Sequence, residues 1–206
     1  MPTPAHQHLR TDPVMAAIIA RIGPIDLQPR RLPPFQAIVQ AIVHQQLSGK
    51  AAETILRRFT ELFTGPAFPS AETVARMDLE KLRTAGLSRP KAGYLHDLAQ
   101  KTLTGVIPSL AECDRLDDAE LIERFTCVKG VGRWTVEMLL IFNLGRPDVL
   151  PVLDLGVRRG FQIAYRKRQL PAPEALQKFG RQWAPHRTLA ARYLWRAADE
   201  PTAKNG

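Results

Sequence analysis

A short segment with two glycines has the clearest potential for ligand binding in this sequence. It reads Val-Lys-Gly-Val-Gly-Arg-Trp-Thr over residues 128–135. Gly130 and Gly132 allow a tight backbone turn and a close approach to a ligand. An apolar helical pattern follows, and the free N–H groups at a helix N-terminus bind anions such as phosphate. A plain corner between two helices is the alternative, but Lys129 and Arg133 beside the glycines favour phosphate binding.

Asp154 is the carboxylate whose position best suits a functional role. It lies beyond the glycine segment, immediately before another helical pattern. Its simplest role is to cap that helix. The cap is compatible with a second role as a negatively charged site residue, because the helix dipole favours a negative charge at this end.

The helices that must position these residues are bounded by recognisable signals. Asp12 begins a helical pattern that Gly23 ends, and Asp117 begins one that ends near Thr126. Asp154 begins another. No stretch alternates between apolar and polar residues as a strand would. The sequence therefore predicts an all-α fold of about ten helices.

The composition is that of a globular protein with an anionic partner. The chain has 206 residues, 45% of them apolar, and a formal net charge of +9. Such a charge favours nucleic acid first and an acidic membrane second, although solvated basic faces alone would also account for it. No apolar run reaches the about 18 residues of a membrane span, and the first residues lack a signal-peptide core. Cys113 and Cys127 are too few for a disulfide framework. We therefore expect an intracellular protein, cytoplasmic at a bacterial nucleoid or nuclear, and not secreted.

Five segments together resemble the helix-hairpin-helix DNA glycosylases, in particular the 3-methyladenine DNA glycosylase II branch. The resemblance implies one catalytic domain over residues 12–198 with a two-lobed all-α fold. Residues 34–125 would form a lobe of central helices, residues 126–142 the hairpin, and the N- and C-terminal helices the second lobe. Residues 1–11 and 199–206 would be flexible ends. The segments that carry the resemblance are residues 41–52, 86–92, 125–140, 149–160 and 183–196.

The resemblance also implies a catalytic site. Asp154 would be the catalytic residue, and Trp134, Met138 and Trp195 would form a base pocket in which a flipped cationic base gains cation–π attraction. Plain core packing is the other interpretation of the two tryptophans. Relatives often carry a second aspartate at the position of Leu153 and an aromatic residue at that of Met138. These departures leave the preferred alkylated base open.

The implied DNA contacts come from the hairpin and from the early helix. One side chain of the early helix would enter the gap left by the flipped nucleotide. Both Gln45 and Gln46 lie at this position, and Gln46 is the candidate for this wedge. A solvated helix end is the alternative interpretation. The implied DNA-binding residues are Gln45, Gln46, Ser48, Lys129, Gly130, Val131, Gly132 and Arg133.

No cofactor is expected, because the histidines do not cluster at metal-ligand spacing. The resemblance implies at most a structural sodium or potassium ion on the backbone carbonyls of Thr126, Val128 and Val131.

The predicted activity is hydrolysis of the N-glycosidic bond of alkylated purines, such as 3-methyladenine and 7-methylguanine, in double-stranded DNA. Bifunctional relatives carry a lysine where this chain has Trp134, so we expect no lyase activity. We also expect a monomer without a membrane partner. Two alternatives stay open. A glycosylase of the same fold for oxidised or deaminated bases would have a pocket rich in hydrogen-bonding groups. A non-catalytic hairpin module would need neither Asp154 nor the early Gln-Gln helix.

Overall fold

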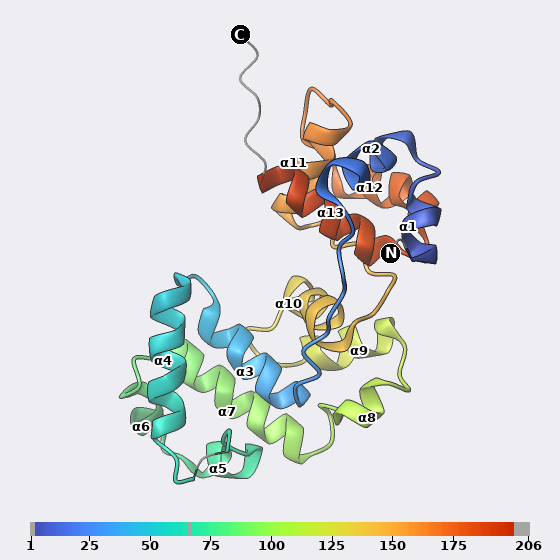
Figure 1. The fold of residues 1–206 in the computed structure, drawn as a ribbon. Helices are drawn as coiled ribbons and strands as arrows, with labels where there is room; N and C mark the ends of the chain where they lie inside the picture. The colour runs from blue at the N-terminus through green and yellow to red at the C-terminus, as the bar shows by residue number, and fades with distance from the viewer. Residues whose placement is uncertain (1–2, 66, 200–206) are drawn as a thin grey trace. The chain divides into compact units, whose positions relative to one another are not determined.

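The computed structural model describes residues 3–65 and 67–199, and the fold of these ranges consists of helices joined by loops (Figure 1). They contain thirteen α-helices, one π-helix and one 3-10 helix, and no strand. The predicted all-α fold is confirmed, with more helices than expected because several short capped turns form helices of their own. No helix in the described ranges is long and apolar enough to cross a membrane. The chain divides into two compact units. Unit 1 combines Met1–Pro29 with Leu140–Gly206, and unit 2 is Arg30–Leu139.

Unit 2 is built around its longest helix, α7 (Arg89–Leu103), which packs against α3, α5 and α6. Leu95 and Leu98 of α7 are fully buried, as are Ile38 and Ile42 of α3. Burying one such side chain stabilises a fold by about 1.5–3 kcal/mol. The other helices of unit 2 are α3 (Pro34–His44), α4 (Gly49–Glu61), α5 (Ala71–Arg76), α6 (Leu79–Arg83), α8 (Leu110–Cys113), α9 (Asp118–Thr126) and α10 (Arg133–Met138).

Unit 1 is made from the two ends of the chain. Its helices are α1 (Pro4–Leu9), α2 (Pro13–Ile22), α11 (Leu155–Ala164), α12 (Pro173–Phe179), the 3-10 helix η2 (Gly180–Trp183) and α13 (Arg187–Asp199). The π-helix η1 (Leu139–Leu144) begins at the last residue of unit 2 and continues into unit 1. The expectation of a flexible end over residues 1–11 was wrong for Pro4–Leu9, because this segment is helical and buries Leu9 in the core. Residues 200–206 lie outside the described residues.

Asp12 connects the early and late helices of unit 1. Its Oδ1 accepts the backbone N–H of Val14 and so caps α2. Its Oδ2 accepts the Trp183 indole N–H at 3.1 Å and the Tyr165 hydroxyl at 2.5 Å. Burial and the hydrogen bond to Asp12 both raise the pKa of Tyr165 far above its usual value. A buried carboxylate with these partners joins segments far apart in the sequence.

Two glycines allow α11 and α13 to pack closely. Gly156 and Gly160 lie four residues apart, on one face of α11. A Cβ atom at position 160 would lie 1.9 Å from the backbone carbonyl oxygen of Leu194, so only glycine permits this contact. The close packing brings the middle of α13 next to the first turn of α11.

Candidate active site

Asp154 sits at the N-terminus of α11, and the predicted cap is confirmed. Its Oδ1 atom accepts the backbone N–H of Val157 at 2.8 Å. The same Oδ1 accepts the indole Nε1–H of Trp195 at 2.8 Å. The carboxylate is therefore oriented by two donors, one from its own helix and one from α13.

Gly156 explains how the indole reaches the carboxylate. A Cβ atom at this position would lie 2.8 Å from Cδ1 of Trp195 and 3.1 Å from Oδ1 of Asp154. Any side chain here would push the ring away from the oxygen it donates to. We did not predict this contact from the sequence, although the four-residue spacing of Gly156 and Gly160 is a signal of closely packed helices.

A cavity of about 530 Å³ in unit 1 has Trp195 in its wall. Phe142 of η1 stacks on the Trp195 ring, with 5.6 Å between centroids and 30° between planes. The guanidinium of Arg192 lies 5.0 Å from the centroid of the Phe142 ring. Burial and the neighbouring charge of Arg196 lower the pKa of Arg192. The volume is in the range of small-ligand sites.

The cavity is more polar than the sequence suggested. The complete lining is Ile22, Pro24, Ile25, Asp26, Phe142, Arg192, Trp195 and Arg196. Of these residues only Trp195 was predicted, because the others carry no recognisable motif. The walls therefore combine aromatic surface with one carboxylate and two guanidinium groups.

The two hairpin glycines, both in unit 2, have different structural roles. Gly130 has a φ of +77°, and a Cβ atom there would lie 2.2 Å from the Tyr94 ring. The fold itself therefore requires glycine at this position. Gly132 is the N-cap residue of α10 with an ordinary φ of −93°, and nothing lies within 4 Å of its missing Cβ. No contact within the described protein explains glycine at position 132. The open space beside Gly132 suits the approach of an external ligand.

Both basic residues of the hairpin donate a hydrogen bond to an acidic side chain, Lys129 through its backbone and Arg133 through its guanidinium. The backbone N–H of Lys129 donates to Oδ2 of Asp97 at 2.8 Å, and the Lys101 ammonium also donates to this carboxylate. Burial raises the pKa of Asp97, but the hydrogen bonds and charges of Lys101 and Lys129 outweigh it and leave the pKa below its usual value. Arg133 donates its Nε–H to Glu137 at 3.0 Å while its side chain stays mostly exposed.

The two wedge candidates differ in what they contact. Gln45 donates its side-chain Nε2–H to the carbonyl oxygen of Gly130 at 2.8 Å. Gln46 is exposed and has a φ of +58°, a left-handed conformation that is uncommon for a residue other than glycine. Ser48 is the exposed N-cap residue of α4, and no hydrogen bond from its side chain caps the helix. Of the two glutamines, Gln46 is thus the more exposed.

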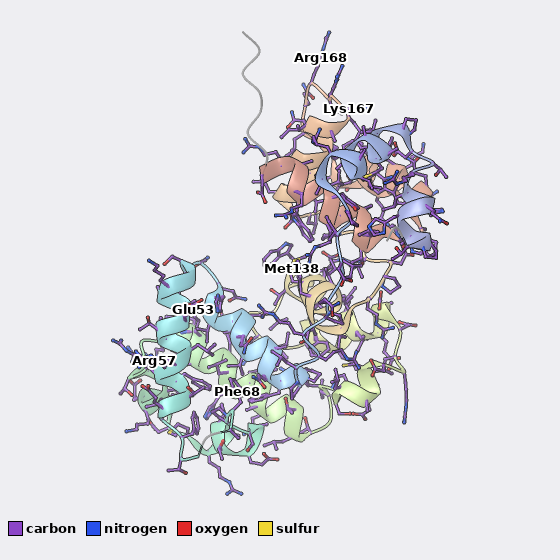
Figure 2. All side chains as sticks on the ribbon, in the orientation of Figure 1. Glu53, Arg57, Phe68, Met138, Lys167 and Arg168 are labelled. Atoms are coloured by element: carbon purple, nitrogen blue, oxygen red, sulfur yellow. The ribbon has the colours of Figure 1, made fainter. Side chains whose placement is uncertain are left out.

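Trp134 and Met138 lie on α10, one helical turn apart, and so face the same side of that helix. Trp134 is 47% exposed, whereas Met138, labelled in Figure 2, is partly buried. Both belong to unit 2. Asp154 and Trp195 belong to unit 1, where the structure brings them into direct contact.

The carbonyls expected to bind a monovalent ion belong to the last residue of α9, Thr126, and to Val128 and Val131 of the hairpin. The Val128 carbonyl accepts the N–H of Val131 at 3.1 Å, and a carbonyl oxygen has a second lone pair. Backbone carbonyls are suitable ligands for sodium and potassium, so the donor set of Thr126, Val128 and Val131 fits such an ion. In the described ranges no group of three or more His, Cys, Asp or Glu side chains could hold a metal.

Comparison with known proteins places this geometry in a family. Residues 39–186 match the family described as the HhH-GPD superfamily base excision DNA repair proteins. The chain belongs to this superfamily.

Individual relatives are similar over most of their length. DNA-3-methyladenine glycosylase 1 of Schizosaccharomyces pombe is 42% identical over 165 residues, 80% of this chain and 72% of the relative. The structure of S. pombe 3-methyladenine DNA glycosylase Mag1 in complex with abasic DNA has a TM-score of 0.82 and 38% identity, and the match covers 94% of this chain and 96% of that one. The structure of DNA-3-methyladenine glycosidase from Bacillus halodurans has a TM-score of 0.87 at 35% identity, covering 96% and 90%.

Proposed function

We propose that this protein is a DNA glycosylase that hydrolyses the N-glycosidic bond of alkylated purines in double-stranded DNA. The observation that carries the proposal is the Asp154 carboxylate, oriented by the Trp195 indole at 2.8 Å and by the first turn of α11. The family membership and the names of the similar proteins support the substrate class.

The chemistry follows from the charge that develops on the sugar. Departure of the base leaves an oxocarbenium-like cation on the deoxyribose. A carboxylate about 4 Å from a unit positive charge stabilises it by roughly 4 kcal/mol at an effective dielectric constant near 20. This corresponds to about three powers of ten in rate. Asp154 can supply this charge and can orient the attacking water. An alkylated purine is already cationic and leaves as a neutral base, so no strong general acid is required.

The other predicted residues have roles in binding. Trp195 is proposed to stack on the flipped base, because an aromatic face attracts a cation. The hairpin from Lys129 to Arg133 is proposed to hold a DNA phosphate on the backbone N–H groups at the start of α10. A sodium or potassium ion on the hairpin carbonyls would fix the turn. We propose that the enzyme acts as a monomer.

Gln46 is the proposed wedge. Its exposed side chain and left-handed backbone suit insertion into the DNA, because strained backbone conformations concentrate at functional sites. Gln45, in contrast, is engaged with Gly130.

The polar groups of the cavity favour a second candidate activity, the excision of deaminated purines. Arginine donates two hydrogen bonds to the O6 and N7 atoms of a 6-oxopurine. Arg192 and Arg196 supply such donors, and Asp26 supplies an acceptor for a ring N–H. Duplexes with hypoxanthine should be compared with methylated duplexes at equal enzyme concentration. Faster release of hypoxanthine would make deaminated bases the preferred substrate.

The proposed function is tested by the bases that the protein releases from methylated DNA, separated by chromatography. We expect free methylated purines, and an abasic strand that breaks only after alkali. Trp134 occupies the position of the lysine in bifunctional relatives, and its indole has no nucleophilic amine. Borohydride added during turnover should therefore trap no protein–DNA adduct. A trapped complex that survives a denaturing gel would disprove hydrolysis by water, and the absence of any released base would disprove the activity.

Trp195→Phe should separate the two roles available to Trp195. Phenylalanine keeps an aromatic face for stacking but removes the Nε1–H that donates to Asp154. A hydrogen bond to a charged group contributes about 1.5–3 kcal/mol, so we expect the single-turnover excision rate to fall roughly 10- to 100-fold. Affinity for an abasic-analogue duplex should change little. An unchanged rate would show that Trp195 acts only as a stacking surface.

A further inference from the structure

Three side chains on one face of α7 hold the two segments proposed to contact DNA. They are Lys91, Tyr94 and Asp97, spaced three residues apart, and we name them the α7 brace. All three are partly buried. The brace contacts the turn that carries Gln46 at its N-terminal end and the hairpin at its C-terminal end.

Lys91 holds the Gln46 turn through backbone atoms. Its ammonium donates to the carbonyl oxygen of Val43 at 2.8 Å and to that of Gln45 at 2.6 Å. These carbonyls lie at the C-terminus of α3, where a positive charge is favoured by the helix dipole. Burial lowers the pKa of Lys91. The residue that follows the two held carbonyls is Gln46, with its left-handed backbone.

Tyr94 and Asp97 hold the hairpin. The Tyr94 ring occupies the space where a side chain at position 130 would lie. Asp97 accepts the backbone N–H of Lys129 at 2.8 Å. Both contacts are to backbone positions of the turn, so they fix its path without occupying the N–H groups at the start of α10.

Gln45 connects the two held segments directly. Its side chain donates to the Gly130 carbonyl at 2.8 Å, while its own carbonyl accepts from Lys91. The Gln46 turn, the hairpin and α7 thus form a closed set of contacts, all within unit 2.

We propose that the α7 brace fixes the distance between the Gln46 turn and the hairpin, and that Lys91 is a positioning residue for nucleotide flipping. The inference rests on the proposed roles of Gln46 and the hairpin. With the brace intact, a phosphate held at the hairpin places Gln46 at one defined step of the duplex. Without Lys91, the Gln46 turn loses two charge-assisted bonds, although the hairpin still binds phosphate. Lys91 therefore supports flipping more than it supports binding.

Lys91→Met is the central variant, because methionine keeps an unbranched side chain only one atom shorter and removes the donors. Lys81→Met is the matched control, since Lys81 is an exposed lysine of the same unit, in the last turn of α6. A duplex with 2-aminopurine beside a tetrahydrofuran abasic analogue reports unstacking by fluorescence. Lys91→Met should reduce this signal and slow excision by about tenfold or more, because misplacement by about 1 Å can cost two powers of ten in rate. Affinity for undamaged duplex should stay within about twofold of wild type.

Two further measurements separate positioning from a loss of stability. Lys91→Arg should restore most of the fluorescence signal, since a guanidinium can also donate to two carbonyls. The double variant with Gln45→Leu and Lys91→Met should lose less of the fluorescence signal than the sum of the losses in the two single variants, because both residues hold the Gln46 turn in the same set of contacts. The fluorescence assay requires no excision, so a failure of the proposed activity would leave this test intact. Equal signals from Lys91→Met and Lys81→Met, or a loss explained by the unfolded fraction at the assay temperature, would overturn the proposal.

Discussion

Asp154→Asn should reduce the single-turnover rate of base release by at least about 100-fold, because the charge that stabilises the sugar cation is lost. The asparagine Oδ1 can still accept from the Val157 N–H and from the Trp195 indole, so the shape of the site is kept. Asparagine is also as good an N-cap as aspartate. We therefore expect a nearly unchanged melting temperature and nearly unchanged affinity for an abasic-analogue duplex.

Asp117→Asn is the matched control for this loss. Asp117 caps α9 by accepting the N–H of Glu120 at 2.8 Å, the same contact that Asp154 makes with Val157. Its replacement removes one charge from an equivalent cap in unit 2 and should leave excision close to the wild-type rate. Excision by Asp154→Asn at a rate near that of Asp117→Asn would exclude Asp154 as the catalytic carboxylate.

Gly132→Val should weaken binding to damaged and undamaged duplex by roughly 10- to 100-fold, because the added side chain stands between the hairpin N–H groups and a phosphate. Each hydrogen bond to a charged group contributes about 1.5–3 kcal/mol. The backbone at Gly132 is extended and the space around its Cβ is open, so the variant should fold. Gly132→Ala should show a smaller loss of the same kind. Affinity is measured by fluorescence anisotropy at several salt concentrations.

Gly93→Ala is the control for Gly132. Gly93 lies inside α7 with nothing within 4 Å of its missing Cβ, and alanine should stabilise the helix by about 0.5–1 kcal/mol without affecting DNA binding. Gly130 cannot serve in this test, because Tyr94 fills the space beside it and any substitution disturbs the fold. Wild-type affinity in Gly132→Val, or an affinity of the wild-type protein that does not change with salt, would refute phosphate binding by the hairpin.

Local signals predicted the caps and turns well. Asp12 and Asp154 cap their helices as the sequence indicated, since capping depends on residues within one helical turn. The apolar pattern after Gly132 predicted a helix. In the structure α10 ends at Met138 and the chain continues as a π-helix. Apolar periodicity alone does not distinguish these two hydrogen-bonding patterns.

The parts of the site that sequence reasoning missed depend on contacts between distant segments. The indole of Trp195 reaches Asp154 across 41 positions in the chain, and Gln45 reaches Gly130 across 85. A motif gives the identity of such residues but not the atom that each one contacts. The resemblance thus led to the correct superfamily. The hydrogen bond between Trp195 and Asp154 could be recognised only from the three-dimensional packing of α11 against α13.

The construction of unit 1 from both ends of the chain has a consequence for biosynthesis. On the ribosome α2 emerges before unit 2 with Met15, Ile18 and Ile19, but the helices that cover these residues emerge after unit 2. Unit 2 is continuous in sequence and can fold in the interval. The Asp12 carboxylate has no indole donor until Trp183 has been synthesised, 171 positions later. A ribosome that stalls before α13 would leave a folded hairpin on a chain whose early helix exposes apolar side chains. Such a product could hold DNA without repairing it, and its uncovered helix would mark it for chaperones and proteases.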